Sequence, residues 1–315
     1  MNEAREKYEQ LLALARPLGP LRIAVVHPCD AASLAGVAAA RAEGLIAPVL
    51  VGPPAKIDAA ASAAGVDLAG YERVDTPHSH AAAAVGVQLV REDRVDALMK
   101  GSLHTDELMG AVIAREGGLR TGRRVSHCFI MDVPGRAEPL IITDAAINIA
   151  PTLEEKADIV QNAIDLAHAL RFAEARVAIL SATESVNPKL PSTVEAAALC
   201  KMADRGQIVG GVLDGPLALD NAISADAARI KGLQHSPVAG RANVLVAPDL
   251  EAGNMLAKSL SFLAGADAAG VVVGARVPIV LTSRSDTLQA RLASCAVALL
   301  LAHARLVDAA KTVAG

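Results

Sequence analysis

The sequence predicts an α/β fold of two lobes, and three observations support this prediction. The chain has 315 residues, more than the common single-domain size of about 100–150 residues. Its hydrophobic content of 52% is sufficient for extensive cores and comes mainly from Ala, Val, Leu and Ile. Short β-branched stretches alternate with Ala-rich helical patterns along most of the chain. Such a pattern is typical of parallel sheets that helices cover on both faces.

The first third of the chain predicts a regular alternation of strands and helices. After a helical N-terminal segment, LRIAVVHP (21–28) predicts a buried strand, and the segment that follows predicts a helix with Asp30 near its N-cap. APVLVGP (47–53) and VDALMKG (95–101) predict further strands, with helical segments between them. Because short helices separate these strands, we expect them to pair in parallel.

The middle of the chain interrupts this alternation. VSHCFIMDV (125–133) and PLIITD (139–144) predict two strands joined by a Pro-Gly turn, and therefore a local antiparallel pair. A helix over 152–171 follows, opened by Thr152 with Glu155 three residues on, which is a capping-box pattern. Further strands are predicted at 175–181, 208–216, 242–250, 269–274 and 278–283.

Composition excludes several classes of partner. Aromatic residues make up 2% of the chain, and the formal charge of −4 gives no basic face for nucleic acid or anionic lipid. The four cysteines are far apart in sequence, which favours free thiols in the cytoplasm over disulfides or a zinc site. The N-terminus has no apolar signal core, and the longest apolar run, 293–304, is shorter than the roughly 18 residues of a membrane span. We therefore expect a cytoplasmic protein without a membrane segment.

Common catalytic motifs are absent from the sequence. It contains no GxGxxG after the first strand and no GxxxxGK[ST], GxSxG or HExxH anywhere. The eight histidines are dispersed, and none pairs with a cysteine at metal-ligand spacing. These absences argue against a Rossmann dehydrogenase, a P-loop enzyme, a serine hydrolase and a zinc protease.

Polar residues instead cluster after predicted strands, where open α/β sheets bind their ligands. Lys100, Ser102, His104 and Thr105 lie between a strand and a helix in KGSLHTDEL. Thr105 with Glu107 is compatible with an ordinary helix cap. Alternatively, the helix N-terminus, the hydroxyls and Lys100 form an anion pocket.

Two further clusters follow later strands. Asp144 and Asn148 follow the strand in LIITDAAINIAPT, where an Asp-Asn pair is usually structural. Asp249, Gly253 and Asn254 crowd one strand-to-helix turn in APDLEAGNML. Gly in a helix costs about 1 kcal/mol relative to Ala, so Gly253 indicates a close approach to a ligand or to another segment.

The segment LTSRSDT presents Ser283, Arg284 and Asp286 directly after an apolar strand. Arg284 offers a planar set of donors suited to phosphate or to a developing oxyanion. Asp286, with Gln289 three residues on, fits the N-cap of the last helix, but its carboxylate could also take a proton from a thiol.

Four segments, KGSLHTDELM, GPLALDNAIS, SPVAGRANVLVAPDLEAGNML and AGVVVGARVPIVLTSRSDT, resemble in sequence and order the phosphate acetyl-/butyryltransferases, or phosphotransacylases. The resemblance covers about residues 95–290 and looks closer to the butyryltransferase branch, without fixing the acyl group. It implies reversible transfer of a short acyl group between coenzyme A and inorganic phosphate. Coenzyme A is then a substrate, and no metal or redox cofactor is expected.

The resemblance also implies a fold like that of isocitrate and isopropylmalate dehydrogenases, with two α/β/α lobes, a cleft between them and a homodimer. In that fold the chain returns to its first lobe near the end. We therefore expect a first lobe of residues 1–124 plus 271–315 and a second lobe of residues 125–270.

By resemblance, Ser283 and Arg284 match the family's Ser-Arg pair. The implied mechanism is direct transfer in a ternary complex: a carboxylate deprotonates the thiol of coenzyme A, the thiolate attacks the acyl phosphate, and the pair stabilises the developing charge. The family's acetyltransferases carry the catalytic Asp several residues beyond the pair, whereas Asp286 follows Arg284 by two positions. Asp286 is therefore either the base on a shortened loop or a helix cap.

Two other functions remain compatible with this fold. A metal-dependent decarboxylating dehydrogenase would need a cluster of Asp residues for a divalent ion, and no such helix is evident in the sequence. A non-catalytic module that binds coenzyme A or acyl phosphate would not need the Ser283-Arg284 pair.

Overall fold

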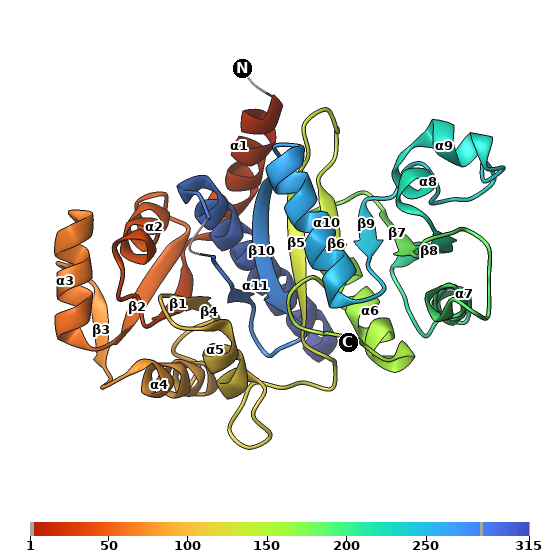
Figure 1. Cartoon of the computed structure of the whole chain (residues 1–315). Helices are drawn as coiled ribbons and strands as arrows, with labels where there is room; N and C mark the ends of the chain where they lie inside the picture. The colour runs from red at the N-terminus through yellow and green to blue at the C-terminus, as the bar shows by residue number, and fades with distance from the viewer. Residues whose placement is uncertain (1–2, 284–285, 315) are drawn as a thin grey trace. The chain divides into compact units, whose positions relative to one another are not determined.

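The computed structural model describes residues 3–283 and 286–314. The chain forms two compact units, Met1–Arg123 with Ala269–Gly315 (unit 1) and Arg124–Ala268 (unit 2). Within unit 1, the last part of the chain pairs with strands from the first part, as the blue and the red-to-olive ribbons of Figure 1 show. That the units are separate domains with a ligand cleft between them stays a prediction.

Unit 1 contains a six-stranded sheet in the order β3-β2-β1-β4-β11-β10. Pairing is parallel from β3 to β11, and β10 runs antiparallel to β11. The strands are β1 (Leu21–Val26), β2 (Ile46–Gly52), β3 (Glu72–Asp75), β4 (Ala97–Lys100), β10 (Asp267–Val273) and β11 (Ile279–Val280). The predicted parallel pairing of the early strands is confirmed. The edge strand β3 was not predicted, because its sequence, ERVD, has no apolar pattern and is largely exposed.

Helices cover both faces of this sheet, since four consecutive residues of β1, Ile23 to Val26, are fully buried. Helix α11 contacts α1 and α2, and α2 in turn contacts α3. Helix α4 contacts α5 and the strands β1, β2 and β4. The helices are α1 (Glu3–Ala15), α2 (Ala31–Ala42), α3 (Pro54–Ala64), α4 (Ser79–Arg91), α5 (Thr105–Val112) and α11 (Leu288–Ala314), with a 3₁₀ turn, η1 (Arg16–Leu18), after α1.

The helix α11 is longer than the apolar run recognised in the sequence. Its segment Leu288–Val307 is long and apolar enough to cross a membrane by length and composition alone. However, 61% of its 18-residue apolar window is buried inside the protein, where α11 contacts α1, α2 and β11. The core helix of a folded domain meets the same criterion, so this feature is weak evidence for a membrane span.

Unit 2 contains a five-stranded sheet in the order β5-β6-β9-β7-β8. The predicted antiparallel pair is confirmed as β5 and β6, and the remaining pairs are parallel. The strands are β5 (Ser126–Asp132), β6 (Leu140–Thr143), β7 (Ala175–Leu180), β8 (Gly211–Leu217) and β9 (Val244–Val246). The helices are α6 (Leu153–Ala169), α7 (Pro191–Asp204), α8 (Leu219–Ile223), α9 (Ala225–Ile230) and α10 (Leu250–Leu263).

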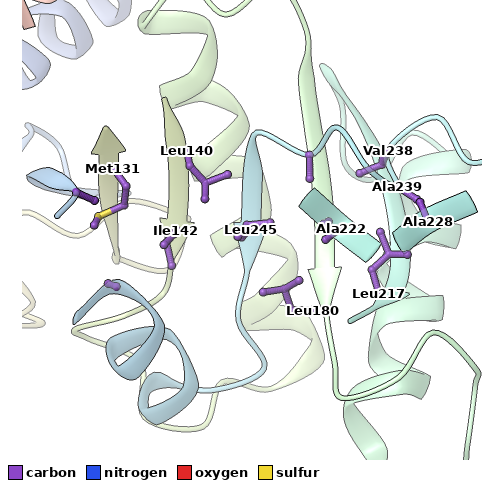
Figure 2. Close-up of a cluster of buried hydrophobic side chains, with 14 residues drawn as sticks. Met131, Leu140, Ile142, Leu180, Leu217, Ala222, Ala228, Val238, Ala239 and Leu245 are labelled. Carbon is purple, nitrogen blue, oxygen red and sulfur yellow. The ribbon is translucent and has the colours of Figure 1, made fainter. Parts of the chain in front are cut away.

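Local sequence signals explain where these elements begin and how they pack. Helix α6 opens with the predicted capping box, in which Thr152 accepts from the Glu155 N–H and Glu155 accepts from the Thr152 N–H. Figure 2 shows a core in which Leu140 and Ile142 of β6 lie beside Leu245 of β9. Partly buried side chains of α10 pack against this cluster, so α10 covers the same face of the sheet.

Candidate active site

Three parallel strands of unit 1 end at one edge of the sheet. Val26 of β1 pairs with Lys100 of β4, and Val280 of β11 pairs with Met99 of β4. Because parallel strands end in the same direction, the loops that follow all three strands converge. This convergence brings Lys100 and Ser102 near Ser283, although about 180 residues separate them in sequence.

The loops after β1 and β4 are tied together through Ser102. Its N–H and its hydroxyl both donate to the carbonyl oxygen of His27, each at 2.9 Å. The Cys29 N–H donates to the Ser102 Oγ at 3.1 Å. Ser102 therefore holds the loop after β4 against the loop after β1. The nearest acceptor for its hydroxyl proton is the His27 carbonyl oxygen.

Helix α2 begins directly after these loops. As predicted, Asp30 is its N-cap and accepts from the Ser33 N–H at 2.7 Å and the Ser33 hydroxyl at 2.9 Å. The first-turn N–H groups of a helix lack partners within the helix and carry the positive end of the helix dipole. Ala31 and Ala32 present this end of α2 to the converging loops.

A cavity of about 380 Å³ lies at this point. The residues that line it come from α2, from β4 with its loop, and from the segment after β11 with α11: Asp30, Ala31, Ala32, Ser33, Lys100, Gly101, Ser102, Thr282, Ser283 and Arg291. All of them belong to unit 1. The lining combines two cationic side chains, several hydroxyls and a helix N-terminus, which together suit an anion.

Hydrogen bonds fix the lysine and the loop after β11. The Lys100 ammonium donates to the carbonyl oxygens of Gly101 at 3.3 Å and Leu103 at 3.1 Å. The Thr282 hydroxyl donates to the Lys100 carbonyl at 3.2 Å. The last residue of β4 and the segment after β11 are thus held against each other at the cavity.

Asp286 lies before the last helix and does not cap it. Helix α11 begins at Leu288, and the Thr287 hydroxyl accepts from the Ala290 N–H at 3.1 Å. The Asp286 carboxylate instead accepts from the Ser283 N–H at 2.6 Å, while the Asp286 N–H donates to the Ser283 carbonyl at 3.2 Å. The interpretation of Asp286 as the N-cap is therefore wrong, because its neighbour Thr287 holds that position.

The environment of Asp286 alters its acidity. Burial raises the pKa of its carboxyl, and the Ser283 N–H, the Arg291 guanidinium and the Lys100 ammonium each act in the opposite direction. The net effect is a pKa above the ordinary value. A carboxylate with a raised pKa is a stronger base than a solvated one.

The cavity lining does not include three further predicted residues of unit 1, Asp286, His104 and Thr105. His104 occupies the N-cap position of α5 without a side-chain cap, and Thr105 is the first helical residue, so the predicted Thr105 cap is wrong. Neither residue lines the cavity. Arg284, the second half of the Ser-Arg pair, lies outside the described residues.

The predicted residues of unit 2 form a different, buried network. Asp144 is buried and accepts from the N–H groups of Ala146, Ile147 and Asn148 and from the Asn148 amide, at 2.5 to 3.2 Å. Burial lowers the pKa of the nearby His127 to about 4, against the opposing effect of Asp144. Asp144 therefore organises the turn that follows β6.

Asn148 links this turn to the start of unit 2. Its side-chain amide donates to the Val125 carbonyl at 2.9 Å, and its Oδ1 accepts from Arg124 Nε at 2.7 Å. Arg124 also pairs with Glu155 of α6 at 2.9 Å. The amide of Asn148 is thus used within the protein.

The start of α10 packs against the same turn. Asp249 is the N-cap of α10, and Asn254 donates to the Ala145 carbonyl at 2.9 Å. A Cβ atom on Gly253 would lie 2.4 Å from the Asp144 carbonyl oxygen. The predicted close approach at Gly253 is confirmed, and the approaching group is another segment of the chain.

Several residues of the cavity were not predicted as site residues. Asp30 was recognised only as a cap, and Ser33, Thr282 and Arg291 were not singled out. Thr282 lies within the segment LTSRSDT and could have been found there. Arg291 carried no sequence signal, because it lies inside a helix among small and apolar residues.

Comparisons with known proteins give a consistent result. A family model described as "Phosphate acetyl/butaryl transferase" matches residues 78–299. A phosphate acetyltransferase of Rhizobium meliloti is 64% identical over 299 residues, which cover 95% of this chain and 94% of that protein. The crystal structure of a branched-chain phosphotransacylase from Enterococcus faecalis V583 is 29% identical, with a TM-score of 0.79, and the match covers 90% of this chain and 99% of that one.

The solved structure of a dehydrogenase has a similar fold. The structure of 4-hydroxythreonine-4-phosphate dehydrogenase from Klebsiella pneumoniae matches with a TM-score of 0.52 at 12% identity, over 90% of this chain and 99% of that one. At this identity the match concerns the fold alone. It confirms the predicted dehydrogenase-like α/β fold class.

We expect Gly253→Ala to lower the free energy of unfolding by about 1–3 kcal/mol, because the added methyl group must displace the backbone at Asp144. Urea denaturation measures the difference. The matched control is Gly110→Ala in α5, where an added Cβ has nothing within 4 Å. Equal stability of the two variants would contradict the close contact at Gly253.

Proposed function

The chain belongs to the phosphate acetyl/butyryl transferase family, and from this premise we propose that the cavity of unit 1 carries the transfer. The chain is a phosphate acyltransferase. In our proposal, a short acyl group moves reversibly between coenzyme A and inorganic phosphate. Coenzyme A acts as a substrate, and no metal or redox cofactor takes part.

The convergence of cationic and N–H donors on one cavity is the observation that carries this proposal. The chain has a net charge of −4, so a phosphate group must be bound by local rather than global charge. Lys100, Arg291 and the first turn of α2 supply such a local field. The hydroxyls of Ser102 and Ser283 lie on the same wall. An acyl phosphate carries the anionic group that this lining suits.

Asp286 is the proposed general base. Its pKa is raised by burial, which brings it closer to the ordinary thiol pKa of about 8.5. In the proposed step, Asp286 takes the proton of the coenzyme A thiol, and the thiolate forms a new bond to the acyl carbonyl carbon. The bond from that carbon to the phosphate oxygen then breaks, and inorganic phosphate leaves with the electron pair. Ser283 and Arg284 are proposed to stabilise the charge that develops on the carbonyl oxygen.

The side chains around the cavity favour direct transfer over an acyl-enzyme intermediate. Burial raises the pKa of the Cys29 thiol to about 11, so this cysteine is a poor nucleophile at neutral pH. The Ser102 hydroxyl donates to the His27 carbonyl at 2.9 Å and lies 3.3 Å from His27 Nδ1. The carbonyl oxygen is thus the nearer acceptor for the hydroxyl proton, and the imidazole nitrogen, which would have to act as the base, is the more distant one.

The other predicted binding residues keep a proposed, indirect role. Five of them use their polar or backbone groups for contacts with other residues of unit 2: Asp144, Asn148, Asp249, Gly253 and Asn254. Their geometry supports a structural function better than direct contact with substrate. Substrate binding by His104 and Thr105 also stays a prediction.

The proposal also covers the acyl group that is transferred, the oligomeric state of the protein and its cellular compartment. Because the relative at 64% identity is a phosphate acetyltransferase, acetyl is the first acyl group to test, followed by butyryl. We further propose a homodimer in the cytoplasm that has no nucleic-acid partner. The comparisons support acyl transfer rather than the decarboxylating dehydrogenase.

The direct test mixes the purified protein with acetyl phosphate and coenzyme A and follows the loss of free thiol. We expect loss that depends on both substrates and on protein concentration. The same assay with propionyl and butyryl phosphate measures the preferred acyl length. If no short acyl phosphate supports thiol loss, the chain is a binding module instead and the proposal is wrong.

Arg284→Lys tests the charge-stabilising role. Lysine keeps the positive charge but loses the planar pair of donors, so we expect kcat to fall by about 10²–10³-fold. Steady-state kinetics measure this change. Arg229→Lys, on an exposed arginine of α9, is the matched control and should retain wild-type rates. A wild-type kcat in Arg284→Lys would refute the role.

Asp286→Asn tests the general base. We expect kcat/KM to fall by about 10²–10⁴-fold, and the remaining rate to lose its dependence on Asp286 ionisation. In the wild type, activity should fall with acid as Asp286 becomes protonated, at a higher pH than for an ordinary carboxyl, because its pKa is raised. The control is Asp226→Asn at an exposed position of α9. An unchanged acid limb in Asp286→Asn would exclude Asp286 as the base.

A further inference from the structure

Arg291 is a buried cation in the first turns of α11. Its side chain is 4% exposed, and among the described residues it forms no ion pair with a carboxylate. Burial of a guanidinium is costly unless its donors find acceptors. An arginine at this position therefore indicates a requirement beyond core packing.

The donors of Arg291 are directed at the loop that carries the Ser-Arg pair. Its Nη2 donates to the Ser283 carbonyl at 2.7 Å, and its Nη1 donates to the Thr282 hydroxyl at 3.2 Å. Thr282 in turn donates to the Lys100 carbonyl at 3.2 Å. One guanidinium thus connects α11, the segment after β11 and the end of β4.

Helix α2 leaves space for this side chain. A Cβ atom on Gly36 would lie 2.9 Å from the Cδ of Arg291, so no larger residue fits without moving the arginine. Gly inside a helix costs about 1 kcal/mol relative to Ala. The Arg291 side chain packs directly against Gly36, which explains why a glycine stands there. The N-terminus of the same helix, α2, lines the cavity.

We propose that Arg291 is a positioning residue for the acyl transfer, which sets the backbone of Thr282 and Ser283 where these two residues line the cavity. This inference rests on the proposed function of the same cavity. Arg291 acts through the loop, because its two side-chain hydrogen bonds to described residues go to residues 282 and 283. A planar fork with two separate donors is needed to hold both acceptors at once.

The first test compares Arg291→Gln and Arg291→Lys with Arg305→Gln. Arg305 lies in the same helix and also donates to a backbone carbonyl, that of Ala275 at 3.0 Å, away from the cavity lining. A displacement of about 1 Å at a catalytic group costs about 10²-fold in rate. We therefore expect kcat to fall about 100-fold in Arg291→Gln and less in Arg291→Lys, with the KM for coenzyme A nearly unchanged. Arg305→Gln should keep the wild-type kcat.

The pH profile separates positioning from a general loss of structure. Asp286 is faced by the Ser283 N–H, by Arg291 of α11 and by Lys100 of β4, and the last two charges lower its pKa. Removing the charge in Arg291→Gln should raise that pKa and move the acid limb of kcat/KM to higher pH. In Arg291→Lys and Arg305→Gln, the acid limb of kcat/KM should stay at its wild-type pH. A lower rate with an unmoved limb in Arg291→Gln would contradict the proposal.

The second test leaves every functional group present. Gly36→Ala pushes on the stem of Arg291, whereas Gly110→Ala adds the same methyl group to α5 with nothing within 4 Å. We expect kcat to fall at least about fivefold in Gly36→Ala alone, with both variants folded by circular dichroism. This pair decides the question if Arg291→Gln does not fold.

The outcomes distinguish the two proposals. An inactive wild-type protein refutes the proposed function, and the positioning role is refuted with it. An active wild type with wild-type kcat in Arg291→Gln, or with equal kcat in Gly36→Ala and Gly110→Ala, overturns the positioning role alone.

Discussion

The parallel pairing of β1, β4 and β11 is the constraint on which the candidate site depends. It aligns Val26 with Lys100 and Met99 with Val280, so three segments far apart in sequence end at one edge. A slip of one residue in β4 would turn Lys100 and its neighbours to the opposite face of the sheet. The full burial of Ile23 and Leu98 makes such a slip costly, because apolar side chains already fill both faces. The core of unit 1 therefore sets the geometry of the cavity.

Polar contacts then refine what the sheet has brought together. Ser102 fixes the loop after β1, and Thr282 fixes the segment after β11, each through backbone carbonyls. Arg291 adds a third connection from α11. A rigid polar framework of this kind holds donors in place before substrate arrives, which is how preorganised sites stabilise charge in a transition state. In unit 2, Asp144 has the corresponding structural role for the turn after β6.

Sequence patterns predicted the elements better than the details of the site. The strand at 21–28 and the capping box at Thr152 were recognised because apolar runs and caps are local signals. The strand β3 was missed because an exposed four-residue edge strand has no such signal. Lys100, Ser102 and Ser283 were recognised from their positions after strands and do meet at the cavity.

Residues whose role depends on tertiary contacts could not be predicted in this way. Arg291 lies in a helix, and only the packing of α11 directs it at the Ser283 carbonyl. Asp286 and Thr287 are both good cap residues, so the sequence alone could not decide that Thr287 caps α11. Gly253 did indicate a close approach, but only the fold identifies Asp144 as its neighbour.

The proposed chemistry is a direct transfer of the acyl group at the cavity, without an acyl-enzyme intermediate. Exchange of isotopically labelled inorganic phosphate into acetyl phosphate tests this most directly, with and without coenzyme A. We predict that label enters acetyl phosphate only when coenzyme A is present, because the Cys29 thiol has a raised pKa and the Ser102 hydroxyl lies closer to the His27 carbonyl oxygen than to a ring nitrogen. Exchange in the complete absence of coenzyme A would require an acyl-enzyme and would exclude direct transfer.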